Sequence, residues 1–203
     1  LLSNTSGHDN TATGVNALLD NTTGGLNTAN GSNALASNTS GSDNTATGVS
    51  ALQNNIASNN TADGAFALEH NSTGGSNTAT GSGALSSNQT GSENTAIGVN
   101  ALAFNVSNDN TATGDQALLS NTTGNSNTAI GVVALVNNTT GSSNIAIGSQ
   151  AGINLTTGNN NIDLGNFGAG SESDTIRIGT SQANPFMAGI LGSVRSNGRR
   201  VCG

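Results

Sequence analysis

The hydrophobic positions of this chain form columns at a nearly fixed spacing and do not form long runs. A Leu preceded by Ala recurs once in every repeat of about 17 residues. These positions are Leu18, Leu35, Leu52, Leu68, Leu85, Leu102, Leu118 and Leu135. The residue after each Leu varies between apolar, polar and charged types, which is typical of a solvent-facing position. We therefore expect the Leu column to fill the interior of a repeated structural unit.

The same spacing governs a polar segment, Asn-Thr-Ala-Thr-Gly in its first copy. Its Asn recurs at Asn10, Asn27, Asn44, Asn60, Asn77, Asn94, Asn110, Asn127, Asn144 and Asn161. Two of these steps are one residue shorter than the others, and they end at Asn60 and Asn110. The sequence thus predicts superrepeats of three coils. Both short coils replace the usual Asn-Thr-Thr-Gly by the Gly-free segments 55–58 and 105–108, and we expect these two turns to look alike.

A repeat of this length is too short for a pair of helices, and the recurring Gly, Asn and Thr are weak helix formers. We expect each coil to hold an extended Asn-Thr-Ala-Thr-Gly strand, a bend after Gly14, a second extended piece around residues 16–19 and a turn at residues 21–24. Stacked coils form in-register parallel ladders that pair the backbone groups without a large core. The predicted fold is an all-β parallel β-roll or β-solenoid of about ten coils.

A second Ala column, from Ala12 to Ala146, lies between a column that is mostly Thr and a column in which Thr alternates with other residues. The column after it becomes apolar toward the C-terminus, at Ile97, Ile130, Ile147 and Leu164. An exposed apolar stripe of this length is unusual in a soluble monomer, so we expect it to be covered. It lies either inside the coil, which we favour, or at a contact between chains.

The period ends near residue 170, which divides the chain into a repeat array over residues 1–170 and a C-terminal segment over residues 171–203. That segment holds the only Pro and the only Met of the chain. We expect it to form a β-rich cap or neck that covers the last coil.

The composition disfavours several classes of partner. Only 15 of the 203 residues are charged, and Trp, Tyr and Lys are absent, so nucleic-acid binding is not expected. No apolar run approaches the roughly 20 residues that cross a bilayer, and the first residues do not resemble a signal peptide. We expect no insertion of this segment into a membrane. The single Cys202 is expected to be an ordinary free thiol.

The coils that begin Asn94-Thr-Ala-Ile-Gly98, Asn127-Thr-Ala-Ile-Gly131 and Asn144-Ile-Ala-Ile-Gly148 resemble known repeats. They are similar to the head repeats of YadA-like trimeric autotransporter adhesins and to the repeat arrays of bacterial and phage tail-fibre-like surface proteins. The resemblance covers roughly residues 1–170. It implies a left-handed β-roll and three chains side by side at a cell or virion surface.

Catalytic chemistry is not expected. The two His residues, His8 and His70, lie in turns that vary between repeats, and we expect both to be exposed to solvent and not to act as the base of a nucleophile. Four acids, Asp9, Asp43, Glu93 and Asp109, are single residues in separate coils, so we expect solvated turns and no metal site. No cofactor motif is present.

We therefore expect a non-enzymatic, extracellular rod or head of an adhesive or tail-type fibre, most simply a trimer that meets a host-surface or matrix ligand. The alternatives are a self-assembling filament subunit and an ice-binding protein that uses the Thr column from Thr11 to Thr128. Several Asn begin Asn-x-Ser/Thr motifs at one turn, and a glycosylating host would place glycans there in a row. These candidate sites are Asn21, Asn38, Asn71, Asn88, Asn121 and Asn138.

Overall fold

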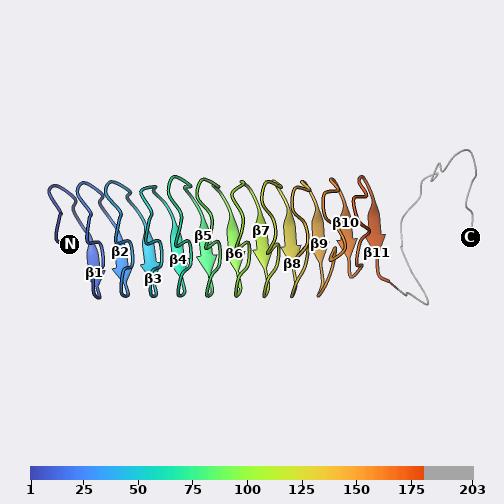
Figure 1. The fold of residues 1–203 in the computed structure, drawn as a ribbon, viewed down its shortest axis with the longest axis horizontal. Helices are drawn as coiled ribbons and strands as arrows, with labels where there is room; N and C mark the ends of the chain where they lie inside the picture. Colours follow the sequence, from blue (N-terminus) through green and yellow to red (C-terminus); the bar gives the residue numbers. More distant parts are fainter. Residues whose placement is uncertain (181–203) are drawn as a thin grey trace, which may run out of the picture.

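The computed structural model describes residues 1–180, and they form a rod of stacked coils with one strand in each coil (Figure 1). The strands are β1 (Thr11–Thr13), β2 (Thr28–Asn30), β3 (Thr45–Thr47), β4 (Thr61–Asp63), β5 (Thr78–Thr80), β6 (Thr95–Ile97), β7 (Thr111–Thr113), β8 (Thr128–Ile130), β9 (Ile145–Ile147), β10 (Ile162–Leu164) and β11 (Ile176–Ile178). Within these residues there is no helix. The chain is a parallel β-solenoid of about ten turns, which confirms the predicted fold class.

The strands pair in sequence order into a single parallel sheet. Equivalent positions stack on one another, as in Thr11 on Thr28 and Ala12 on Ala29. This register continues beyond the expected boundary at residue 170, because β11 still pairs with β10, with Ile176 beside Ile162, after a shorter final coil. The rest of the expected cap, residues 181–203, lies outside the described residues.

The interior is filled by the columns that the sequence singled out. Every member of the Leu column, from Leu18 to Leu135, is fully buried, and the middle Ala of each strand from Ala29 to Ala146 is buried as well. Strands β1 to β9 therefore present their Ala to the interior and their first and third residues to the outside. The apolar core of a single coil is therefore very small, and the stability of the rod comes from the repeated contacts between neighbouring coils.

The expected second extended piece around residues 16–19 is not a strand. It is a series of tight turns in which Asn16 and Leu18 have φ angles of 58° and 49°. The backbone still bonds to the next coil here, since the Leu18 N–H donates to the Ala34 carbonyl at 3.0 Å. A left-handed Leu costs about 1–2 kcal/mol, while its complete burial contributes about 2–3 kcal/mol. The inward direction of the side chain thus outweighs the backbone preference.

The Gly after each strand from β1 to β8 is required by both conformation and space. Gly31 has a φ of 152°, outside the range of L-residues with a side chain. A Cβ atom at Gly31 would also collide with the carbonyl group of Gly48 in the next coil. The coils can stack at strand spacing only because this column has no side chains.

Two columns of Asn lie inside the coil beside the Leu column. The strand-side Asn ladder is formed by Asn10, Asn27, Asn44, Asn60, Asn77, Asn94, Asn110, Asn127, Asn144 and Asn161. The turn-side Asn ladder is formed by Asn4, Asn21, Asn38, Asn55, Asn71, Asn88, Asn105, Asn121 and Asn138. From Asn21 onward, members of both ladders are at most 1% exposed.

The strand-side ladder connects backbone groups of successive coils. The Oδ1 of Asn27 accepts the backbone N–H of Asn44 at 3.0 Å, and its Nδ2 donates to the Gly41 carbonyl at 2.8 Å. The same arrangement repeats along the rod and ends where Asn161 accepts the N–H of Thr175 at 3.1 Å. Each Asn satisfies groups that a core of Ala and Leu would leave unpaired.

The two Gly-free turns look alike, as predicted. In an ordinary turn the Asn Nδ2 donates to the carbonyl three residues on, as from Asn21 to Gly24 at 2.9 Å. In the short turns it donates to the carbonyl only two residues on, from Asn55 to Ala57 at 2.7 Å and from Asn105 to Ser107 at 2.8 Å. One missing residue therefore shifts the partner of the amide by one position.

The Leu column should be the most sensitive part of the fold. Replacement of the fully buried Leu85 by Asp would place a charge among apolar side chains. We expect Leu85→Asp to lower the free energy of unfolding by more than about 3 kcal/mol in urea denaturation. The control Glu69→Ala, at the position after the Leu of another coil, should change it by less than about 1 kcal/mol. The reverse order of the two effects would show that the interior is misassigned.

Candidate interaction face

The outer face of the sheet is the most regular surface of the described residues. Because each strand has three residues with the middle one inside, two columns of side chains face outward from every strand. The strands are short, parallel and in register, so these columns run side by side along the rod (Figure 1). We call this surface, made by the first and third residues of β1 to β11, the sheet face.

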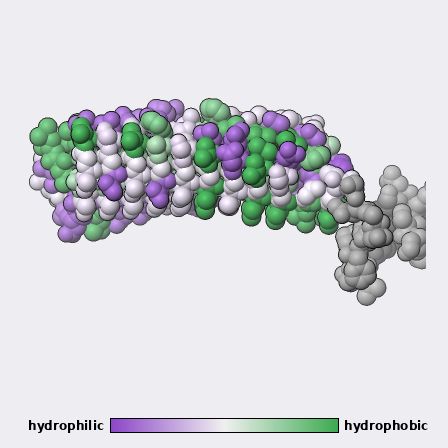
Figure 2. Space-filling view, turned by 90° about the horizontal axis from the view of Figure 1, so that it is seen from below, coloured by the Kyte–Doolittle hydropathy of each residue, from purple (hydrophilic) through white to green (hydrophobic). Residues whose placement is uncertain are grey.

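The sheet face changes character halfway along the rod. From β1 to β5 its ten outward positions carry eight Thr, one Asn and one Asp. From β6 to β11 eight of its twelve outward positions are Ile or Leu, the other four are Thr, and none is charged. On the side shown in Figure 2, hydrophobic surface is likewise more frequent over the C-terminal coils. The face therefore offers hydroxyl groups at one end and an apolar surface at the other.

The apolar stripe is outside the coil, which corrects the placement we favoured from the sequence. Ile97 and Ile130 are each 42% exposed, and Ile147 is 44% exposed. The reason is the alternation of the strand: since the preceding Ala faces inward, the residue after it must face outward. Thr and Ile both occur in this column because it faces away from the core, so packing inside the coil does not restrict the residue type. No other segment of residues 1–180 covers the stripe.

The candidate glycosylation residues are not on the surface. Asn21, Asn38, Asn71, Asn88, Asn121 and Asn138 all belong to the turn-side Asn ladder and are fully buried. The nitrogen that would carry a glycan is already a hydrogen-bond donor, as in Asn71, whose Nδ2 donates to the Gly74 carbonyl at 2.8 Å. A row of glycans along one edge would therefore require these buried amides to leave the interior of the coil.

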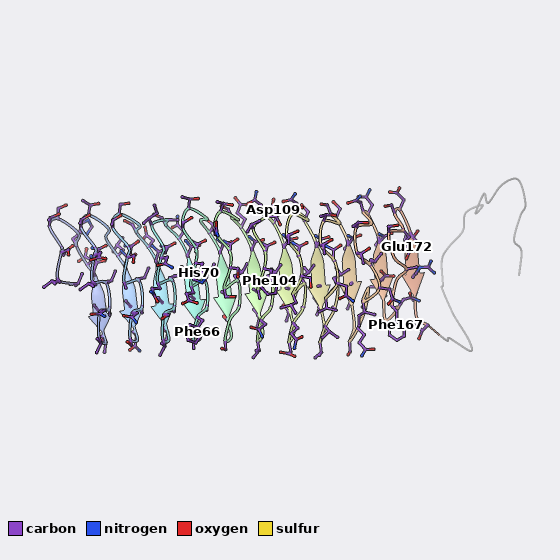
Figure 3. The ribbon with its side chains drawn as sticks, in the orientation of Figure 1. Phe66, His70, Phe104, Asp109, Phe167 and Glu172 are labelled. Carbon is purple, nitrogen blue, oxygen red and sulfur yellow. The ribbon has the colours of Figure 1, made fainter. Side chains whose placement is uncertain are left out.

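The titratable residues singled out from the sequence stay separate. His8 Nδ1 lies 3.0 Å from the carboxylate of its neighbour Asp9, and His70 Nε2 lies 3.7 Å from that of Glu69. His70, Asp109 and Glu172 come from different coils along the rod (Figure 3). Asp9, Asp43, Glu93 and Asp109 are exposed turn residues with positive φ. Residues 1–180 contain no group of three His, Cys, Asp or Glu side chains that could hold a metal ion.

One charged cluster escaped the sequence analysis, at the C-terminal end of the sheet. Asp163 takes the inward place of Ala in β10 and is 1% exposed, and Arg177 stacks on it from β11. Arg177 does not bond to Asp163; its Nη2 and Nε donate to Glu172 at 2.6 and 2.8 Å. Neither carboxylate oxygen of Asp163 has a hydrogen-bond partner within the described residues. The break in the Ala column at Ile162-Asp163-Leu164 was the available signal.

The environment of these carboxyl groups shifts their pKa values in opposite directions. Burial, reinforced by the negative charge of Glu172 and offset in part by Arg177, raises the pKa of Asp163 to about 6. The hydrogen bonds from Arg177 lower the pKa of Glu172. Asp163 therefore changes its charge near neutral pH, while Glu172 is already ionised there.

This cluster predicts a pH dependence of stability. Because the pKa of Asp163 is higher in the folded chain than its usual 3.8, the folded state binds the proton more tightly. Its contribution to stability is present below about pH 4 and is lost as the pH rises through about 6. We expect Asp163→Ala, which restores the Ala column, to stabilise the chain at pH 7.5 and to have a smaller effect at pH 4.5. Urea midpoints of both proteins at the two pH values test this, and an equal difference at both would contradict it.

Comparison with known proteins adds no relative. No protein-family model, no curated protein and no solved structure matches the chain. Within residues 1–180 no helix has the length and apolar character needed to cross a membrane. The function has to be argued from the geometry of the coil and its sheet face.

Proposed function

We propose that this chain is the rod or head of an extracellular surface fibre, in which copies of the chain associate side by side through the C-terminal half of the sheet face. The observation that carries the proposal is the uncharged surface of Ile and Leu from β6 to β11. An apolar stripe of this kind is a typical contact surface in soluble proteins. The rod would act through its repeated surfaces and not through a catalytic pocket.

The geometry of the stripe favours a second copy of the same chain as its partner. Its side chains repeat at the spacing of parallel strands, about 4.8 Å. Over several coils, such an array is matched best by another array of the same pitch. The resemblance to YadA-like heads and tail-fibre-like arrays favours three chains, left-handed coils and a location at a cell or virion surface. The exposed turns remain for a host-surface or matrix ligand.

Light scattering of the full chain tests the association. We expect a mass three times the 19.7 kDa of one chain. Replacement of the 42%-exposed Ile130 by Asp should release single chains whose circular dichroism is unchanged, because the side chain lies outside the core. The control Thr80→Asp changes the same column in the hydroxyl half and should leave the trimer intact.

The other outcomes separate the alternatives. A mass that keeps rising with concentration would favour an open-ended filament subunit over a closed trimer. A wild-type chain that stays single at high micromolar concentration, or an Ile130→Asp variant that remains trimeric, would contradict association through this half of the face.

A second function, ice binding, is favoured by one observation. Both outward columns lie on the same side of the sheet, so β1, β3, β5 and β7 each present two Thr side chains side by side. The first column has Thr in every strand from β1 to β8, about 4.8 Å apart, and the third column has Thr in every second strand, about 9.6 Å apart, with about 6.6 Å between the two columns. Asn30, Asp63 and Ile97 interrupt the third column. A regular lattice of hydroxyl and methyl groups is the kind of surface that could order water in an ice-like array.

Thermal hysteresis measurements test this second function. If the lattice binds ice, the full chain should separate melting from freezing temperatures, and Thr45→Lys in the middle of the lattice should abolish the effect. Thr23→Lys, which changes an exposed Thr in a turn, is the matched control and should leave it unchanged. Absence of hysteresis in the wild-type chain would exclude ice binding and leave the fibre proposal standing.

A further inference from the structure

The turn-side Asn ladder is interrupted at regular places. Within its continuous stretches, each Asn Nδ2 donates to the Oδ1 of the Asn in the preceding coil. These rungs are Asn21 to Asn4, Asn38 to Asn21, Asn71 to Asn55, Asn88 to Asn71, Asn121 to Asn105 and Asn138 to Asn121, with distances from 2.6 to 3.0 Å. After every second rung the next one is missing. Within the described residues, the buried Oδ1 atoms of Asn38, Asn88 and Asn138 consequently have no hydrogen-bond partner.

The two short turns cause the first two interruptions. Asn55 and Asn105 direct Nδ2 to a carbonyl only two residues on, and neither amide donates to the preceding coil. In an ordinary coil, one amide serves both partners, as Asn71 does with Asn55 at 2.6 Å and Gly74 at 2.8 Å. At the third interruption, Leu155 stands where an Asn would be and has no amide to donate.

Backbone hydrogen bonds are missing at the same two corners. Inside a continuous stretch the N–H groups of Thr22 and Thr23 both donate to the Thr39 carbonyl, at 2.9 and 3.0 Å. Across the first interruption the equivalent N–H groups of Thr39 and Ser40 donate to no backbone carbonyl of the described residues. The same holds for residues 89 and 90 across the second interruption. We call these two corners, Asn38/Asn55 and Asn88/Asn105, the block joints.

The opposite side of the coil is continuous across the block joints. Strand β3 pairs with β4 in the usual register, and Asn60 donates its N–H to the Oδ1 of Asn44 at 3.0 Å. The third interruption is milder, because Thr139 N–H still donates to the Thr156 carbonyl at 2.8 Å. A block joint is therefore closed on the strand side and open at one corner, like a hinge.

From this pattern we infer that the rod is a series of three-coil blocks and that it opens first at the two block joints. In a solenoid each coil contacts only its neighbours, so the interface between two coils decides where the rod separates. An interface that lacks three hydrogen bonds and buries an unpaired acceptor is weaker than its neighbours. The three-coil superrepeat of the sequence would thus be a unit of opening as well as a unit of sequence.

Hydrogen exchange of Leu amides in the full chain tests the inference with matched sites. The N–H of Leu35 and Leu85 bonds across the block joints, to Ala51 and Ala101, each at 3.0 Å. The N–H groups of Leu52 and Leu68 make the same bond inside a block, to Ala67 and Ala84, also at 3.0 Å. All four Leu are fully buried. We expect Leu35 and Leu85 to exchange about tenfold faster than Leu52 and Leu68. Equal rates, or a smooth gradient from the ends of the rod, would overturn the inference.

A repaired joint gives a second test with a control in the same molecule. Replacement of Ile56-Ala57 by Thr-Thr-Gly converts the short turn into the ordinary Asn-Thr-Thr-Gly turn. We expect exchange at Leu35 to slow about tenfold, because the rung to Asn38 can form, while Leu85 at the untouched joint keeps its rate. A repaired chain in which Leu35 and Leu85 still exchange at the same rate would show that the joints are not the cause.

Discussion

The fold depends on side-chain amides that pair backbone groups inside a very narrow coil. Each coil has an apolar core of only one Leu and two Ala side chains, which buries little apolar surface. Much of each coil consists of turns, whose backbone N–H and C=O groups have no partner within the strand ladder. Asn fills part of the interior and also pairs these backbone groups, because its Oδ1 accepts a backbone N–H of the next coil and its Nδ2 donates to a turn carbonyl. Asp lacks the donor, and Gln would add a methylene group to a space that repeats without variation.

The two remaining requirements follow from this tight path. Leu18 and its equivalents adopt left-handed backbone angles because only that conformation directs the side chain inward at a sharp turn. Gly31 and its equivalents have no side chain because the next coil passes directly above them. Each requirement is met in almost every coil, and this explains how a chain with so little hydrophobic sequence forms a defined structure.

Freedom is left only on the outside, and function is expected there. The sheet face changes from Thr to Ile along the rod without any change in strand pairing. At the C-terminal end the column of inward Ala residues is interrupted, since Asp163 replaces Ala in β10 and Arg177 stacks on it from β11. Departures from a repeat that is otherwise so strict are the best indications of local roles.

The sequence by itself determined the coil length, the parallel in-register stacking, the inward Leu column and the likeness of the two short turns. A period this short leaves few other arrangements for a chain so rich in Gly and Asn. Only the tertiary structure decided which polar and apolar columns lie inside, because every column shares the same period whichever way it faces. Asn21 is buried and Ile130 exposed because the direction of a side chain depends on the path of the turn and the alternation within a short strand. The pairing of Arg177 with Glu172, and not with Asp163, depends on the loop between β10 and β11, which follows no repeat.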